Sequence, residues 1–332
     1  QIKKVYLKLY KNKYFGIDEI FKLYKINKNL FKINSEIKRN EGSVLSTGQK
    51  YWKRAKNIIP GGNMLLSKRP EMFLPDKWPA YYTKAKGCYV WDLDSIKYSD
   101  MSLMSVGTNI LGYSNKDIDD AVIKSIKKSN MSSLNCPEEI FLTEKLIDMH
   151  PHFEMARYAR TGGEANSIAV RIGRAASGKD KVAICGYHGW HDWYLSANHN
   201  TFDKKGVLKD HLLPGLSTLG VPKNLKNTVY PFKFNDFKAL ENICSKNKIG
   251  VIKMEIFRNF APKNGFLQKV RKLADDKNIV LIFDECTSGF RETFGGLHLK
   301  YKVNPDICIL GKALGNGFPI TTILGKKNIM EN

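Results

Sequence analysis

An α/β fold is predicted by this sequence, with a mostly parallel sheet and helices on both of its faces. From residue 116 onward, helical patterns of apolar residues alternate with short apolar runs of strand length. That alternation is typical of parallel sheets covered by helices. Hydrophobic residues make up 42% of the 332-residue chain, which is enough material for a large buried core. In such folds the chemistry lies at the carboxyl ends of the strands.

Three segments are expected along the chain. Residues 1–42 form a basic segment with an amphipathic helix near Asp18–Tyr24. Residues 43–115 contain a helix over Tyr51–Ile58, which Pro60 ends, and a hairpin that turns at Asp94-Ser95. Residues 116–332 form the large domain, for which helices are predicted at Ile118–Lys128, Glu138–Met149, Ala165–Ala176, Phe237–Ser245 and Phe266–Asp276, and strands at Met155–Ala159, Val182–Cys185, Val251–Glu255, Val280–Asp284 and Ile307–Leu310.

The charge balance could suggest an anionic partner, because the formal net charge is +22. Lysine supplies 44 of the basic residues and arginine only 10. Nucleic-acid readers rely on arginine for bidentate contacts, and the sequence has no arginine cluster. A lysine-rich, arginine-poor composition is what an A·T-rich genome encodes, so we expect no nucleic-acid partner.

Cysteine usage and hydropathy bear on location. The six cysteines are scattered without a C-x-x-C pair, which indicates reduced thiols and a cytoplasmic protein. No apolar run approaches the ~18 residues of a membrane span, so no membrane partner is expected. The chain begins at Gln1 and stops at Asn332, directly after its most motif-dense stretch. We interpret it as a piece of a longer protein.

Unusual residues follow three of the predicted strands. Gly162 and Gly163 open a helix, and such a turn binds phosphate through its free N–H groups. Asp284 ends an apolar strand, where its charge needs a cation or several donors. Lys312 lies between glycines that let a ligand approach the backbone. Each feature also has an ordinary explanation when it is taken singly. The glycines could form a common strand-to-helix turn, Asp284 could be a helix cap or part of a loop salt bridge, and Lys312 is one lysine among 44.

Together the three features fit one cofactor. A phosphate-bearing aldehyde would lie on the glycine turn, while Asp284 holds its ring nitrogen protonated and Lys312 forms a Schiff base with it. These are the requirements of pyridoxal 5′-phosphate (PLP), whose protonated ring stabilises carbanions. The loop around Lys312 is not a nucleotide-binding P-loop, because the G-x-x-x-x-G-K order is absent.

The motifs around these residues resemble those of class III PLP-dependent aminotransferases. TGGEA, GYHGWHDW, IFDECTSGFR and LGKALGNG occur in that family's order and spacing. The resemblance runs from about Leu45 to the end of the chain and is strongest to the glutamate-1-semialdehyde 2,1-aminomutase branch. It implies the PLP-dependent transferase fold type I, a C-terminal small domain that is missing from this chain, and a homodimer.

The resemblance also implies roles for individual residues. Lys312 would carry the cofactor and then move a proton between it and the substrate carbon, while Asp284 would pair with the ring nitrogen. The other cofactor-binding residues that it implies are Gly162 and Gly163 at the phosphate, Tyr187 on one face of the ring with His188 from the same motif, Cys286 on the other face, and Glu255 as an acidic support of the pocket.

Departures from the family pattern concern the substrate more than the cofactor. The phosphate turn reads Thr161-Gly162-Gly163 where the family usually has Ser-Gly-Thr. Lys68 or Arg69 lies near the place of the aminomutase's substrate-binding arginine, and Val106 aligns with a substrate-side tryptophan. These changes favour a related aminotransferase that acts on another substrate. Cys185, His188 and His191 could also suggest a metal site. Those residues lie inside a matched motif without obvious acidic ligands nearby, so no metal is expected.

The leading function is transfer of an amino group from a small-molecule donor to an aldehyde or keto acceptor. The alternatives are the aminomutase reaction within one molecule, a non-catalytic fragment that keeps the fold, and a basic polyanion binder. Residues 1–42 faintly resemble the tail of cytidylyltransferases of surface-polysaccharide synthesis. They could equally be a lysine-rich helix without a function of its own.

Overall fold

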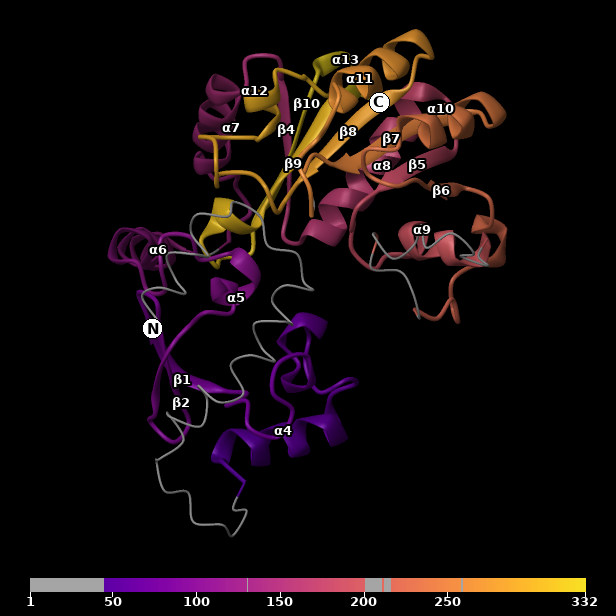
Figure 1. The fold of residues 1–332 in the computed structure, drawn as a ribbon. Helices are drawn as coiled ribbons and strands as arrows, with labels where there is room; N and C mark the ends of the chain where they lie inside the picture. The colour runs from indigo at the N-terminus through magenta and orange to yellow at the C-terminus, as the bar shows by residue number, and fades with distance from the viewer. Residues whose placement is uncertain (1–44, 130, 201–210, 212–215, 258) are drawn as a thin grey trace. The chain divides into compact units, whose positions relative to one another are not determined.

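A computed structural model of the chain describes residues 45–129, 131–200, 211, 216–257 and 259–332 (Figure 1). The predicted basic segment 1–42, with its helix near Asp18–Tyr24, lies outside the described residues. Two compact units make up the chain, and the boundary between them falls after Tyr81. In the described part, no helix combines the length and the apolar character that crossing a bilayer requires.

The described residues of the first unit, 45–81, are built around one α-helix, which confirms the helix predicted over Tyr51–Ile58. The Oγ of Ser46 caps its start by accepting the N–H of Gln49 at 3.3 Å. The buried indole of Trp52 donates to the Glu71 carboxylate at 2.9 Å and fixes the helix to the following loop. The elements of this unit are α4 (Thr47–Ile58) and the 3₁₀ helices η1 (Leu66–Lys68) and η2 (Pro70–Met72).

The second unit begins with an antiparallel sheet in the order β1-β2-β3. The predicted hairpin is confirmed, and its turn forms because Asp92 Oδ1 accepts the N–H groups of Asp94 and Ile96 at 3.0 and 2.8 Å. This part consists of β1 (Tyr82–Lys86), β2 (Tyr89–Asp92), β3 (Lys97–Ser99), the short helix α5 (Leu103–Gly107) and α6 (Lys116–Lys128).

A seven-stranded sheet in the described residues forms the centre of the second unit, in the order β4-β10-β9-β8-β7-β5-β6 (Figure 1). β10 runs antiparallel to both of its neighbours, and the other pairs are parallel. The prediction of a mostly parallel sheet is thus confirmed. The strands are β4 (Met155–Ala159), β5 (Lys181–Cys185), β6 (Val229–Pro231), β7 (Ile249–Glu255), β8 (Val280–Glu285), β9 (Ile307–Leu310) and β10 (Thr321–Gly325).

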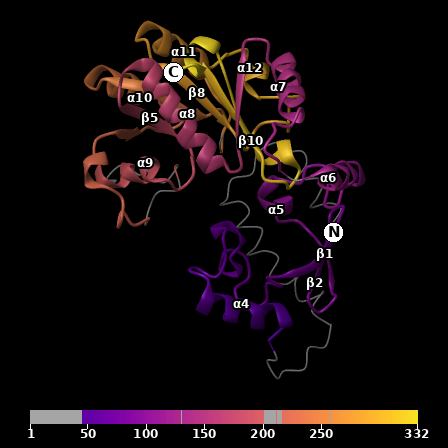
Figure 2. The same ribbon diagram turned by 180° about the vertical axis from the view of Figure 1, so that it is seen from behind.

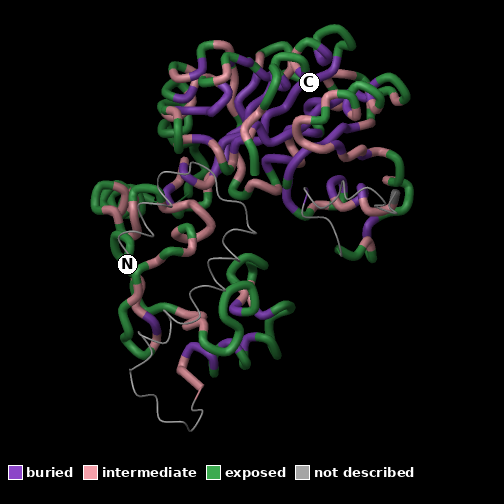
Figure 3. Tube along the Cα trace, in the orientation of Figure 1, coloured by how far each residue is buried: buried purple, intermediate pink, exposed green. Residues whose placement is uncertain are grey.

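Helices cover both faces of this sheet. α8 packs on one face, towards the viewer in Figure 2, against a cluster that includes Val251, Ile282 and Ile309. α10 and α11 pack on the other face around Ile252, Met254 and neighbouring apolar residues, so the central strands are almost wholly buried (Figure 3). The helices of this part are α7 (Glu138–Met149), α8 (Gly162–Ser177), α9 (Asp192–Leu195), α10 (Phe237–Lys246), α11 (Phe266–Asp276), α12 (His298–Tyr301), α13 (Lys327–Met330) and the 3₁₀ helices η3 (Ser196–Asn200), η5 (Lys223–Leu225) and η6 (Lys312–Gly315).

The register brings the strand ends of interest to one edge of the sheet. Glu255, the last residue of β7, is paired with Asp284 of β8, and Asp284 is paired with Ile309 of β9. The chain order and the parallel pairing therefore place the residues after β8 and β9 side by side. Sequence reasoning missed β1, β6 and the antiparallel β10, which are short strands without a distinctive apolar run.

Candidate functional site

Two buried carboxylates end β8, and their side chains lie on opposite faces of the sheet. Asp284 is 4% exposed and shares its face with Ile282 and α8, whereas Glu285 is fully buried on the other face. A buried carboxylate is stable only when cations or hydrogen-bond donors surround it. The donors around each carboxylate therefore indicate what each one does.

Asp284 is held by a histidine, a backbone amide and a lysine. His188 Nδ1 donates to Oδ2 at 2.8 Å, and the N–H of Cys286 donates to Oδ1 at 3.2 Å. The Nζ of Lys253 lies 3.7 Å from Oδ2. Burial alone would raise the pKa of Asp284, but the Lys253 charge and the hydrogen bonds outweigh it and hold the pKa well below its usual value. Asp284 is therefore an anion at neutral pH.

His188 is the neutral partner of this anion. It is completely buried, and burial together with the Lys253 charge lowers its pKa to about 4. A neutral imidazole carries one N–H, which here is the Nδ1–H donated to Asp284. Its Nε2 is buried and finds no hydrogen-bond partner among the described residues.

The glycine turn begins α8, one turn earlier than the predicted start at Ala165. Thr161 caps the helix: its Oγ1 accepts the Glu164 N–H at 3.2 Å, while the Glu164 carboxylate accepts the Thr161 N–H at 3.0 Å. The first intrahelical bond runs from Ala165 to Thr161. The N–H groups of Gly162 and Gly163 precede that bond and point out of the helix start, as an anion site requires.

Four loops converge beside Asp284. A side chain added at Gly162 would meet the Cys286 sulfur at 3.4 Å, and one added at Gly311 would meet the same sulfur at 3.2 Å. A side chain at Gly189 would come within 3.1 Å of Gly163 Cα. The loops after β4, β5, β8 and β9 are thus in contact, and glycines allow the close approach. Burial raises the pKa of the Cys286 thiol well above its usual value, so this cysteine is a packing residue here.

Lys312 lies at the same edge of the sheet as Asp284. It follows β9 with a left-handed backbone, φ 45°, and its Nζ donates to Thr287 Oγ1 at 2.8 Å. Thr287 comes three residues after Asp284 in the loop that follows β8. The structure therefore brings together the lysine, the carboxylate and the glycine turn that the sequence singled out.

Glu255 supports the loop that carries Tyr187. Its carboxylate is 7% exposed and accepts the Tyr187 N–H at 3.0 Å. Gly186, with φ 111°, passes so close to this carboxylate that any side chain there would clash with it. The Tyr187 ring is 40% exposed and packs edge-on against Tyr194, and burial raises its pKa. The partly exposed ring remains available for contact with a ligand.

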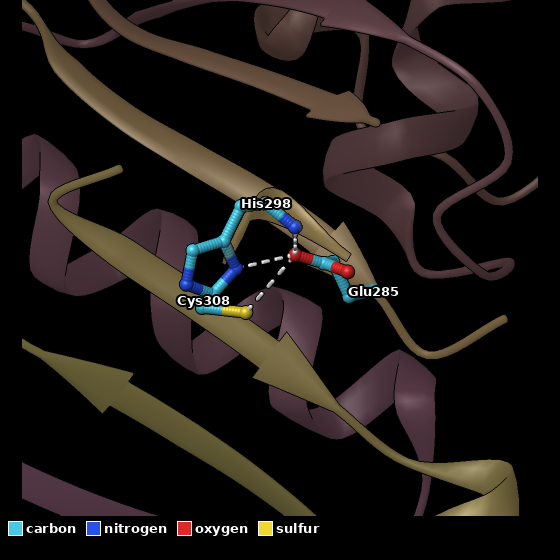
Figure 4. Close-up of side chains that lie close together, drawn as sticks. All are labelled: Glu285, His298 and Cys308. Carbon is cyan, nitrogen blue, oxygen red and sulfur yellow. Dashed lines mark hydrogen bonds and ion pairs between the residues drawn. The ribbon is translucent and has the colours of Figure 1, made fainter. Parts of the chain in front are cut away.

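Glu285, on the opposite face, is surrounded by protein donors (Figure 4). Its Oε1 accepts the Nδ1–H and the backbone N–H of His298 at 2.6 and 3.1 Å, and the Cys308 thiol lies 3.8 Å away. Its Oε2 accepts Ser288 Oγ at 3.0 Å and the N–H of Leu297. This carboxylate joins β8 to β9 and to the start of α12.

Residues of metal-binding type occupy other roles in the described chain. His191, weighed in the sequence as a ligand, bonds Ser167 Oγ at 2.5 Å through Nδ1, and Cys185 is buried in the apolar core. Glu285, His298 and Cys308 do bring their polar atoms within 4.8 Å of one another. Glu285 Oε1 accepts hydrogen bonds from His298 Nδ1 and the Cys308 thiol, while His298 Nε2 is buried without a hydrogen-bond partner among the described residues.

Lys68 and Arg69, the substrate residues expected from the sequence, belong to the first compact unit. Lys68 ends η1, and the Arg69 guanidinium packs over Gly61, where φ is 75°. Their role in substrate binding stays a prediction. Val106, aligned with a substrate-side tryptophan, lies in the second unit within a run of left-handed residues, with φ 61°.

Comparison with known proteins decides the family. The family described as aminotransferase class-III matches residues 75–332. The chain belongs to this family. Class III aminotransferases are PLP-dependent enzymes, and the sheet with its covering helices is that of the PLP-dependent transferase fold type I.

Individual relatives of this class III chain carry more than one activity in their names. It is 36% identical over 296 residues to a 3-aminobutyryl-CoA aminotransferase of Cloacimonas acidaminovorans, a match that covers 86% of this chain and 66% of the relative. It is 34% identical over 301 residues to a glutamate-1-semialdehyde 2,1-aminomutase of Methanothrix thermoacetophila, with 87% and 65% covered. An omega-transaminase structure from Sphaerobacter thermophilus superimposes with a TM-score of 0.75 at 26% identity, covering 88% and 66%. The chain thus spans about two thirds of the length of the relatives it matches.

Two polar residues of this class III site were missed by the sequence reasoning. Thr287 follows the FDE motif and receives the Lys312 hydrogen bond. Lys253 lies beside Asp284 from inside the apolar strand β7. A lysine within the run VIKMEI is itself a signal, because lysines are almost never fully buried unless they are paired.

Proposed function

We propose that this protein is a PLP-dependent aminotransferase that moves an amino group from a small-molecule donor to an aldehyde or keto acceptor. The observation that carries the proposal is the convergence of three groups at one sheet edge. Asp284 is a buried anion, Lys312 bonds Thr287 in the adjoining loop, and the Gly162-Gly163 turn touches that loop through Cys286. The 36% identity to a curated aminotransferase supports the same reaction class.

The residues present fit the cofactor. PLP carries a phosphate, a ring nitrogen that accepts a proton and an aldehyde. The N–H groups at the start of α8 suit the phosphate, and the Asp284 anion suits a protonated nitrogen. The buried Nε2 of His188 has no hydrogen-bond partner among the described residues, so it can accept a hydrogen bond from a bound ligand. Among the described residues Lys312 Nζ makes a single hydrogen bond, to a hydroxyl, so it is available to an aldehyde.

Each residue then has a defined task. When bound, PLP supplies an aldehyde that condenses with amines and a ring that takes up electrons from the substrate carbon. Asp284 holds the proton at the ring nitrogen, and His188 keeps Asp284 oriented through the Nδ1 hydrogen bond. Lys312 Nζ would hold the aldehyde end of the cofactor and, as a free amine, would accept and return a proton at the substrate carbon. Tyr187 and Cys286 would border the ring, and Glu255 positions the Tyr187 loop.

Borohydride trapping tests this assignment directly. The protein is incubated with PLP, reduced and digested, and the peptide that carries the pyridoxyl group is identified by mass spectrometry. We expect the label on Lys312, together with visible absorbance that is lost in Lys312→Ala. Lys327→Ala is the control, because Lys327 is an exposed lysine of α13. A label spread over surface lysines, or its persistence in Lys312→Ala, would refute the proposal and favour the inert-fragment alternative.

The aminomutase reaction is the second candidate, supported by the 34% identity to a curated glutamate-1-semialdehyde 2,1-aminomutase. In the aminomutase reaction the amino group moves within one substrate molecule, whereas in the aminotransferase reaction it moves from a donor to a second molecule. Adding glutamate-1-semialdehyde without an amino donor and measuring 5-aminolevulinate separates them: the aminomutase forms that product, and the proposed aminotransferase forms none. Val106 at the position of a substrate-side tryptophan favours the aminotransferase.

We also propose that the complete protein is a cytoplasmic homodimer. The resemblance to class III aminotransferases supports the dimer, and the six cysteines, scattered without a C-x-x-C pair, support a reducing compartment. Light scattering of the purified protein at micromolar concentration measures its mass, and a monomer would refute this part of the proposal.

A further inference from the structure

Lys253 is a fully buried lysine in the middle of β7, and the proposed reaction leaves it without a task. Its side chain is 0% exposed and lies on the face of the sheet that α8 covers. On this face β7 presents Val251, Lys253 and Glu255 in alternation, and Ile282 of β8 is the strand partner of Lys253. Apolar residues surround this position, so the presence of a charged side chain needs an explanation.

The Nζ of Lys253 has no hydrogen-bond partner among the described residues. An ammonium group has three donors, and burying them unbonded is unfavourable unless an opposite charge compensates. The compensating group is Asp284, whose Oδ2 lies 3.7 Å from Nζ. The contact of Lys253 Nζ with Asp284 is thus an ion pair without a hydrogen bond.

Of the titratable groups around Lys253, Asp284 is the principal partner. Glu255 follows on the same strand and accepts the Tyr187 N–H, while Cys286 and Cys308 are thiols whose pKa values burial raises. His188 is neutral and faces the same Asp284 oxygen. Burial lowers the pKa of Lys253, and the Asp284 charge acts in the opposite direction.

We propose that Lys253 is a positioning residue that acts through Asp284: its ammonium offsets part of the carboxylate's charge and so weakens the hold of Asp284 on a proton at the cofactor's ring nitrogen. This inference rests on the proposed function, because it assigns the ring nitrogen to Asp284. Two cations would share one carboxylate, so each makes the other less stable. Lys253 therefore tunes the ring towards its unprotonated form.

The test measures the ring nitrogen itself. Pyridoxamine 5′-phosphate labelled with ¹⁵N in the ring is bound to the protein, and its nitrogen chemical shift is followed against pH. This ligand has no aldehyde, so Lys312 does not react with it. In Lys253→Met we expect the ring nitrogen to titrate about one to two pH units higher than in the wild type, a 10- to 100-fold gain in proton affinity. An unchanged titration would overturn the inference.

Control variants separate this role from packing. Lys181→Met removes a half-buried lysine of β5 that bonds Asn247, away from Asp284, and should leave the titration unchanged. In an Asp284→Asn background, Lys253→Met should have little effect, because an unpaired buried lysine loses its proton. If Lys253→Met still raises the titration of the ring nitrogen to the same extent in that background, Lys253 does not act through Asp284. Should Lys253→Met not fold, Lys253→Gln gives the same reading with a polar, neutral side chain.

Failure of the inference is distinguishable from failure of the proposed function. If pyridoxamine 5′-phosphate does not bind, or PLP does not label Lys312, the proposed function is wrong. If both occur and the ring nitrogen titrates identically in wild type and Lys253→Met, only the role of Lys253 is wrong.

Discussion

The two carboxylates at the end of β8 are neighbours in sequence, but they differ in the number of hydrogen bonds that they receive. Glu285 receives hydrogen bonds from the backbone and side chains of the loop to α12, two on each of its oxygens. Asp284 receives one backbone N–H and one histidine, and its third neighbour, Lys253, makes no hydrogen bond in the described part of the chain. Each carboxylate has a buried histidine, but only the histidine of Asp284 belongs to a loop that meets the glycine turn.

This difference distinguishes a structural carboxylate from one arranged for a ligand. A carboxylate whose acceptor sites are filled by the protein fixes local geometry and has nothing left to offer. A carboxylate held as an anion with few donors retains the capacity to bind a further cation. The same dipeptide therefore contributes a support on one face of the sheet and, as we propose, a ligand-binding group on the other.

Removing the structural carboxylate is expected to have the largest effect. Glu285→Ala would leave the His298 N–H, the Leu297 N–H and a buried imidazole unbonded, so we expect a loss of about 3–5 kcal/mol in the free energy of unfolding. Urea unfolding measures it. Glu292→Ala removes an exposed acid paired with Lys300 and should cost less than about 1 kcal/mol. Equal losses in the two variants would contradict the comparison.

Removing Asp284, the proposed ligand-binding carboxylate, should act on function more than on stability. Asp284→Asn keeps the shape but withdraws the charge, so we expect kcat/KM to fall on the order of 10²- to 10³-fold, as for lost electrostatic stabilisation. Stability should change less than in Glu285→Ala, because the unpaired Lys253 can lose its proton. Steady-state kinetics and urea unfolding of the same preparation measure both. Wild-type activity in Asp284→Asn would show that the two carboxylates have been assigned wrongly.

The sequence predicted the strand ends better than the contacts between them. Asp284 and Lys312 could be found because apolar runs precede them, and parallel strands place their ends at one edge. The His188–Asp284 hydrogen bond joins residues 96 positions apart, and no local pattern encodes such a pairing. Lys253 was overlooked because strand periodicity shows that a residue is on a face, and only the register shows which carboxylate it meets.

Acidification should weaken the Asp284 face through His188. Its pKa is about 4 in the fold, below the ordinary value of 6.5, so the unfolded chain binds the proton first as pH falls. The contribution of His188 is complete above pH 6.5 and is lost towards pH 4, by up to about 1.4 kcal/mol per pH unit. His188→Gln should flatten the dependence of the unfolding free energy on pH by that amount. Parallel curves for variant and wild type would show that folding leaves the pKa of His188 unchanged.

The smallest effect is expected where the Glu255 carboxylate holds the loop that carries Tyr187. Gly186→Ala and Gly178→Ala both place alanine at positive φ, 111° and 63°. The new methyl group at Gly186 would meet the Glu255 carboxylate, whereas Gly178 has open space around it. Gly178→Ala should cost about 1 kcal/mol from the backbone alone, and Gly186→Ala about 1–2 kcal/mol more from the clash. Because the clash displaces Glu255 from the Tyr187 N–H, Gly186→Ala should also weaken PLP affinity severalfold, and Gly178→Ala should not. Unfolding free energies and PLP titrations of both variants measure the two differences, and identical behaviour would mean that Glu255 does not position the loop.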